Sequence, residues 1–184
     1  MTPQKPSLGL ATLSSLHRYI GPDTSLQTAA SPCDCADVQR AVPFHRAYNP
    51  DAGSYFYTTN TTEFTNAINN LGYRDEGIDG FIFPSSERGT VPFFRMLKPS
   101  LNVHFYTIDT NEVKSSRQNL GYRDDGIAGF VYPRSMCTAI PLFRMVRGWG
   151  YFYTTSATER NYAGRGGWGA DGTAAWVLPT NEAF

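Results

Sequence analysis

The chain has 184 residues and a balanced charge, with 16 basic and 16 acidic side chains. A neutral protein lacks the basic surface that a phosphate backbone attracts, so we do not expect nucleic acid as its main partner. Charged residues make up only 17% of the chain and aromatic residues 14%, alongside 17 glycines and 12 prolines, which favours many short strands over long helices.

Residues 1–41 are dominated by Pro, Ser, Thr and Ala and are predicted to form a largely irregular N-terminal arm. One apolar patch in this arm could dock on the rest of the protein; it consists of Leu13, Leu16, Tyr19 and Ile20. The N-terminus shows no signal peptide, so the chain is either a mature or recombinant form or leaves the cell by another route. No apolar run approaches the roughly 18 residues of a membrane span. We expect an extracellular protein without such a span.

The three cysteines are Cys33, Cys35 and Cys137. The first two lie too close together to bridge each other without strain. We expect a disulfide between Cys35 and Cys137, because each comes just before the start of a repeat; three free or buried thiols are the alternative. Two near cysteines and a distant one, with no histidine nearby, are a poor zinc site. No metal and no cofactor is predicted.

Residues 42–184 contain three copies of one unit, at 42–90, 91–139 and 140–184. Val42, Val91 and Ile140 are spaced 49 residues apart. Each unit predicts a strand that begins near a proline and ends in an arginine, a second strand, a helix and a third strand. The second strands are predicted at 55–59, 104–108 and 151–155, and the third strands at 80–84, 129–133 and 175–179.

A capping box predicts where each helix begins: Asn60, Asp109 or Ser156 is the N-cap, and a glutamate follows three residues later. Gly72 and Gly121 are placed to end the first two helices, whereas three glycines shorten or fray the third. The predicted fold is α+β and mainly β. It has three pseudo-symmetric strand-strand-helix-strand repeats, closed about a three-fold axis as a trefoil-like or small propeller-like body.

The segments HFYTIDTNE and NLGYRDDGIAGFVYP of the second unit resemble a repeat family of unknown function in extracellular bacterial and fungal proteins. The resemblance covers about residues 40–180. It implies an accessory module or stand-alone protein of a kind suspected to bind glycans or cell walls, without an established activity. His104 matches the family's histidine, whereas Tyr55 and Tyr151 take its place in the other units. The third unit departs from the pattern at Trp168 and 174–176.

Most repeated polar residues have a structural interpretation. The capping boxes account for the three glutamates, and Arg46, Arg95 and Arg144 are expected to clamp the acidic turns between units. The turns Asp75-Glu76-Gly77, Asp124-Asp125-Gly126 and Asp171-Gly172 offer too few ligands for calcium. No catalytic motif accompanies the three histidines, so we do not expect an enzyme.

Aromatic side chains interleaved with polar ones favour a non-catalytic, lectin-like protein with one weak site per repeat, binding glycans or cell-wall polysaccharide. Each tyrosine could instead belong to the core, as Phe56, Phe105 and Phe152 are expected to, while Trp149 has the best prospect of exposure. One alternative is a protein-interaction module, such as a protease inhibitor or defence protein, that uses the loops 49–54, 98–103 and 147–150. Another alternative is a structural accessory domain. The candidate ligand-binding residues are His104, Tyr106, Asp124, Asp125, Tyr55, Tyr57, Asp75, Glu76, Trp149, Tyr151, Tyr153, Trp168 and Asp171.

Overall fold

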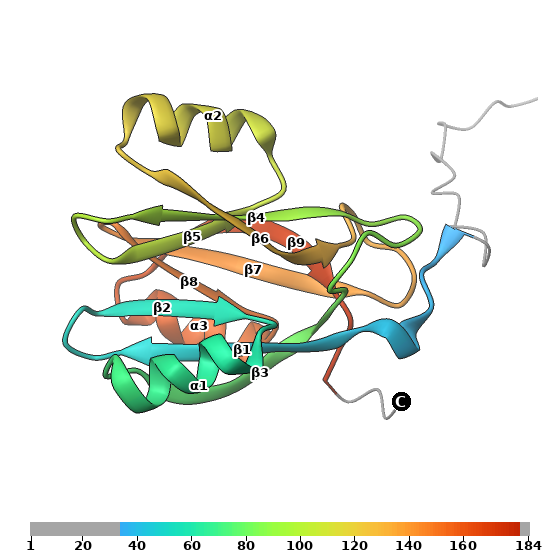
Figure 1. The fold of residues 1–184 in the computed structure, drawn as a ribbon, viewed down its shortest axis with the longest axis horizontal. Coiled ribbons are helices and arrows are strands. Elements are labelled where there is room, and N and C mark those ends of the chain that lie inside the picture. The colour runs from blue at the N-terminus through green and yellow to red at the C-terminus, as the bar shows by residue number, and fades with distance from the viewer. Residues whose placement is uncertain (1–33, 181–184) are drawn as a thin grey trace, which may run out of the picture.

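A computed structural model describes residues 34–180 and shows three similar units, each with two strands, a helix and a third strand, as predicted (Figure 1). The first unit comprises β1 (Val42–Asn49), β2 (Ser54–Thr58), α1 (Thr61–Asn70) and β3 (Arg74–Ile82). The second comprises β4 (Val91–Lys98), β5 (Val103–Thr107), α2 (Thr110–Asn119) and β6 (Arg123–Val131). The third comprises β7 (Ile140–Arg147), β8 (Gly150–Thr154), α3 (Ala157–Arg165) and β9 (Gly169–Val177).

Each unit builds its own antiparallel three-stranded sheet, with the first strand in the middle, in the orders β2-β1-β3, β5-β4-β6 and β8-β7-β9. Single β-bridges outside these sheets join every unit to the other two. The bridged pairs are Phe81 with Leu178, Phe83 with Phe130, and Tyr132 with Trp176. The fold is therefore mainly β, with three small sheets packed together.

The helices begin at the predicted residues. The Asn60 side chain accepts hydrogen bonds from the backbone N–H groups of Thr62 and Glu63. The side chain of Asp109 accepts one from the N–H of Asn111, and that of Ser156 accepts one from the N–H of Glu159. The predicted reciprocal bond from the glutamate is absent in α1, where the Thr58 hydroxyl accepts from the Asn60 N–H instead. This frees the glutamate side chains for another partner, described below.

The third strands begin several residues earlier than predicted, because the acidic segments are bulges inside these strands instead of turns between elements. The pairing of β1 with β3 shifts register between His45 and Ala47, opposite Ile78 and Asp75, and the other sheets shift at the equivalent place. Gly77, Gly126 and Gly172 lie in the left-handed region, with φ between 87° and 93°. A glycine there accommodates the extra residue of a bulge without steric strain.

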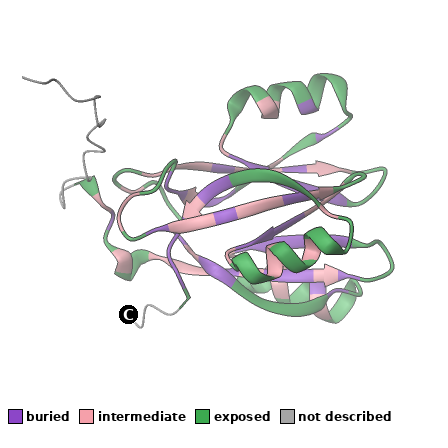
Figure 2. Ribbon diagram, turned by 180° about the vertical axis from the view of Figure 1, so that it is seen from behind, coloured by how far each residue is buried: buried purple, intermediate pink, exposed green. Residues whose placement is uncertain are grey.

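A central hydrophobic core joins all three units, and both faces of each sheet are covered. One face of each sheet contributes to the shared core, which includes Phe44, Phe93 and Leu142. Beneath the helices, the opposite faces form smaller clusters, one around Phe56 under α1 and one around Phe105 under α2. The helices themselves are largely exposed (Figure 2).

The segment before the first unit is attached to the rest of the fold by the predicted disulfide. Cys35 and Cys137 are bonded, with 5.6 Å between their Cα atoms. The N–H of Ala36 donates to the Tyr132 hydroxyl at 3.1 Å, beside a short 3-10 helix at Val38–Arg40. The docking patch and Cys33 lie outside the described residues, as does most of the predicted arm. Within residues 34–180, no helix is long and apolar enough to cross a membrane.

Candidate ligand-binding sites

Three of the tyrosines predicted to face a ligand are inaccessible. Tyr57, Tyr106 and Tyr153 are at most 1% exposed and lie edge to face with ring centroids 5.4–5.5 Å apart. The alternation of strand residues does place Tyr106 on the face opposite Phe105, but that face packs into the central core. These three positions are therefore corrected from surface to core.

The buried tyrosine hydroxyls connect the edge strands of the units. The Tyr106 hydroxyl donates to the Tyr57 carbonyl at 2.9 Å and accepts from the Tyr57 N–H at 2.8 Å. Tyr57 forms the same pair of bonds with the Tyr153 backbone, and Tyr153 forms it with that of Tyr106. Each phenol thus satisfies backbone groups at an open sheet edge, where they would otherwise remain unpaired.

The arginine that recurs in the first strand of each unit pairs with the glutamate of the preceding unit. Arg95 forms a bidentate ion pair with Glu63, in which its two terminal nitrogens lie 2.9 and 3.0 Å from the carboxylate oxygens. Arg46 binds Glu159 in the same manner, and Arg144 contacts Glu112 at 2.9 Å. The glutamates are therefore structural, as expected, but as partners in inter-unit ion pairs more than as helix caps.

The acidic bulge residues divide into two kinds. Asp75 and Asp124 are exposed, and each accepts a hydrogen bond from the N–H of the bulge glycine two residues later. Asp125 and Asp171 instead contact the arginine of their own unit at 2.8 Å, and Glu76 lies 3.5 Å from Arg46. Glu76, Asp125 and Asp171 therefore already have a cationic partner. Among these five residues, only Asp75 and Asp124 form no ion pair.

His104, Tyr55 and Tyr151 occupy equivalent positions, at which each unit reaches the aromatic residues of the preceding unit. Tyr55 lies 4.9 Å from Phe152 and 6.1 Å from Trp168, measured between ring centroids. His104 lies 5.3 Å from Phe56, and its Nε2 is 3.5 Å from Asp125. The hydrogen bond from His104 and the attraction of Arg95 lower the pKa of Asp125.

The shorter His104 side chain borders a hollow of about 250 Å³ between α1 and the β4–β5 hairpin. His104 is 8% exposed, and its buried Nδ1 has no hydrogen-bond partner among residues 34–180. Besides His104, the hollow is lined by Phe56, Glu63, Asn66, Ala67, Leu71, Tyr73, Leu97 and Asn102. It combines an apolar floor with a few polar groups, the usual composition of small-molecule sites.

A second hollow, of about 260 Å³, forms where the hairpin loops of all three units meet. Trp149 is 49% exposed here, as predicted, with the Lys98 ammonium 3.9 Å from its ring centroid. Trp168 lies in the same hollow under the Arg147 guanidinium, 4.8 Å from its ring centroid. Figure 1 shows the hairpin loops at the end of the molecule opposite the N-terminal segment.

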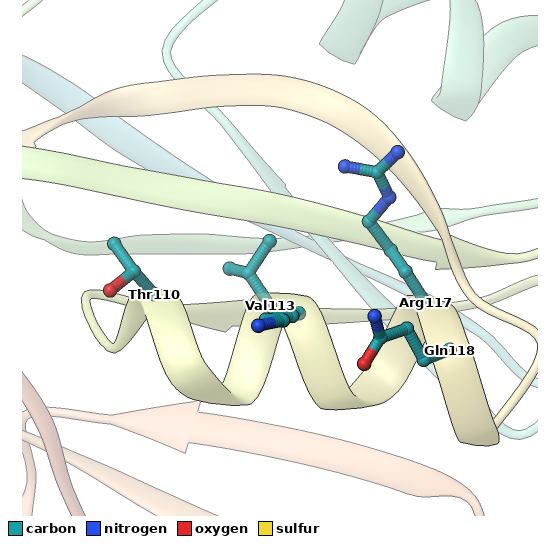
Figure 3. A pocket seen from close by; sticks show the side chains of 5 residues that line it. Thr110, Val113, Arg117 and Gln118 are labelled. Atoms are coloured by element: carbon teal, nitrogen blue, oxygen red, sulfur yellow. The ribbon is translucent and has the colours of Figure 1, made fainter.

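A third hollow, of about 510 Å³, follows α2, and its lining comes from that helix alone. Thr110, Val113 and Arg117 project from α2 toward the neighbouring strands (Figure 3). Lys114 and Gln118 complete the lining. No side chain of another unit converges there, so it is a weaker candidate than the other two.

Of the residues that line the hollow beside His104, sequence reasoning named only His104 as a ligand-binding candidate, and Tyr73 and Asn102 are two polar residues that it missed. Tyr73 follows α1 and corresponds to Tyr122 and Trp168 in the other units, and Asn102 sits in the β4–β5 loop, with its amide donating to the Tyr73 hydroxyl at 3.3 Å. The signal available was the single histidine at a position that holds tyrosine in the other two units. Among residues 34–180, no group of three or more His, Cys, Asp or Glu side chains is placed to hold a metal ion.

The structure thus defines a mainly-β protein of three repeated units, with one hollow at the boundary between the first and second units and another at the hairpin end. The chain belongs to a family described as a Domain of unknown function (DUF5648), which matches residues 43–178. No curated protein and no solved structure matches it.

Proposed function

We propose that this protein is a non-catalytic, extracellular carbohydrate-binding protein whose site is the hollow at the hairpin end. The observation that carries the proposal is the half-exposed indole of Trp149, beside Lys98, in a hollow that also contains Trp168 and Arg147. An exposed aromatic ring can stack on the apolar face of a sugar, while the flanking cations donate to its hydroxyl groups.

The three hairpin loops contribute different residues to the hollow, which favours a single composite site over three equivalent sites, one in each repeat. Trp149 belongs to the third unit only, and the matching loops of the first two units contribute Ala52 and Leu101 instead. We further propose that the units close about a pseudo-three-fold axis. The tyrosine hydrogen bonds and the arginine–glutamate pairs support this, because each runs from unit to unit and returns to the first.

The disulfide supports the extracellular location, because such bonds persist mainly in oxidising compartments. A protein partner is the second candidate function. The 42% exposed Leu101 beside Trp149 favours it, since exposed aliphatic and aromatic side chains in one patch are typical of protein contacts.

A glycan-array screen followed by calorimetry tests the proposal. We expect at least one glycan class to bind, and Trp149→Ala to weaken that binding about ten-fold, equivalent to about 1.4 kcal/mol. Tyr162→Ala is the matched control, because Tyr162 is a 72% exposed aromatic residue on α3 outside the hollow, and it should bind like the wild type. Absence of binding to any glycan, or equal losses in both variants, would overturn the proposal.

A further inference from the structure

The boundaries between units share one arrangement of aromatic side chains. At the boundary between the second and third units, Tyr151 packs against Phe105, with 5.4 Å between ring centroids. Phe105 also lies edge to face with Tyr122, with 4.9 Å between ring centroids, and Tyr151 packs against the cluster that includes these two residues. At the boundary between the third and first units, Tyr55 packs against Phe152 and Trp168. A tyrosine ring therefore fills the space over the aromatic pair at both boundaries.

The boundary between the first and second units has the same aromatic pair, Phe56 and Tyr73, but no tyrosine to cover it. His104 takes that position. It contacts Phe56, and its Nε2 lies 3.5 Å from the carboxylate of Asp125 in its own unit. Imidazole is shorter than phenol, and the hollow of about 250 Å³ lies where a longer side chain would extend. This volume is just below the roughly 300–1,000 Å³ of sites for drug-sized ligands, which suits a compound of one ring.

The polar groups around the hollow suit a hydroxyl group on that ring. The Tyr73 hydroxyl accepts from the Asn102 amide, so its own proton is available to a ligand oxygen. The side chains of Asn66 and Glu63 lie on the α1 side, where a ligand hydroxyl can donate to an amide or carboxylate oxygen. Phe56, Ala67 and Leu97 supply apolar surface for the ring.

We propose that this hollow is a binding site for a small phenol, which takes the place that a tyrosine of the protein fills at the other two boundaries. The ring of the ligand packs on Phe56 and its hydroxyl meets that of Tyr73. The site is present once per molecule, since only the second unit has histidine at this position. It shares no lining residue with the hollow at the hairpin end, so it is independent of the proposed glycan site.

The test is a titration of the full chain with 4-methylphenol, which has the structure of a tyrosine side chain, followed by calorimetry and NMR. We expect saturable binding with one site per chain. Toluene has the same shape without the hydroxyl and should bind at least five-fold more weakly. Tyr73→Phe should remove this preference, because it should weaken the binding of 4-methylphenol and leave the binding of toluene unchanged. Failure of 4-methylphenol to saturate the protein, or equal affinity for toluene, would overturn the proposal.

Two variants locate the site. His104→Tyr restores the side chain of the other boundaries and should reduce phenol affinity at least ten-fold without lowering the melting temperature. Leu71→Trp changes a 56% exposed residue at the rim, so it should fold normally and also hinder entry. Trp149→Ala is the control and should bind the phenol like the wild type. Undiminished phenol binding in the rim variant, or in a folded His104→Tyr protein, would show that the ligand binds elsewhere.

Discussion

Asp79 is a buried acid with more negative than positive neighbours. It is 6% exposed and lies 3.0 Å from Arg46, which also contacts Glu159 and Glu76. Alanine replaces it in the other units, at Ala128 and Ala174. Burial raises the pKa of Asp79 to about 6, and the attraction of Arg46 only partly offsets this. Arg46 is thus the shared cationic partner of two carboxylates of the first unit, Glu76 and Asp79, and of Glu159 from the third unit.

This arrangement predicts a pH dependence of stability. The pKa of Asp79 is higher in the folded state than its usual unfolded value of about 3.9, so the contribution of Asp79 to stability is fully present below about pH 4 and is lost as pH rises through about 6. Between pH 4 and 7.5, the wild type should lose on the order of 2 kcal/mol relative to Asp79→Asn. Urea unfolding of both proteins at several pH values measures this difference, and a constant or opposite difference would contradict it.

The neighbouring acids of the second unit make a contrasting pair. Asp125 is engaged by Arg95 and His104, and its lowered pKa means that its contribution to stability is lost as pH falls. Asp125→Asn should cost about 1–3 kcal/mol, as expected for a hydrogen bond to a charged group. Asp124→Ala should cost less than about 1 kcal/mol, because Asp124 is exposed and the third unit already has Ala170 there.

Thermal unfolding of these two single variants separates their structural role from ligand binding. If Asp124→Ala weakens glycan binding at unchanged stability, the exposed bulge takes part in recognition. If Asp125→Asn melts like the wild type, its ion pair contributes little.

At the scale of elements, the edge strands β2, β5 and β8 depend on the buried phenols for their hydrogen bonds. Tyr106→Phe keeps the ring but removes the hydroxyl that serves the N–H and C=O of Tyr57. Each unpaired buried group costs about 1–3 kcal/mol, so the variant, which leaves two such groups, should lose roughly 2–6 kcal/mol. Denaturant unfolding measures the loss, with Tyr162→Phe on the exposed face of α3 as the control. Equal stability of the two variants would mean that water or backbone movement replaces the missing bonds.

The whole molecule is held at the end opposite the hairpins by Cys35–Cys137, which joins positions 102 residues apart. A crosslink over a loop of this length restricts the unfolded chain strongly, so Cys35→Ser/Cys137→Ser should lose about 2–5 kcal/mol of stability. Cys33→Ser is the matched control and should melt like the wild type. Mass mapping of unreduced protein must also show the two paired sulfurs; finding both free would contradict the assignment.

Several features of this protein are visible in the sequence because they depend on neighbours in the chain. The 49-residue spacing of Val42, Val91 and Ile140 established the three units. The N-caps Asn60, Asp109 and Ser156 located the helices, because a cap bonds to amides only two or three residues away. The disulfide partners also followed from their matching places before two units.

Tertiary structure alone decided which aromatic residues a ligand can reach. Strand alternation predicts that Phe105 and Tyr106 lie on opposite faces of β5. It does not predict that both faces are covered, so the sequence could not assign Tyr106 to the core. The sequence likewise did not reveal that Glu63 would turn from its own helix to Arg95 of the next unit. Burial and inter-unit pairing depend on residues brought together from distant parts of the chain. The hollow beside His104 exists for the same reason, because it is the space between two units.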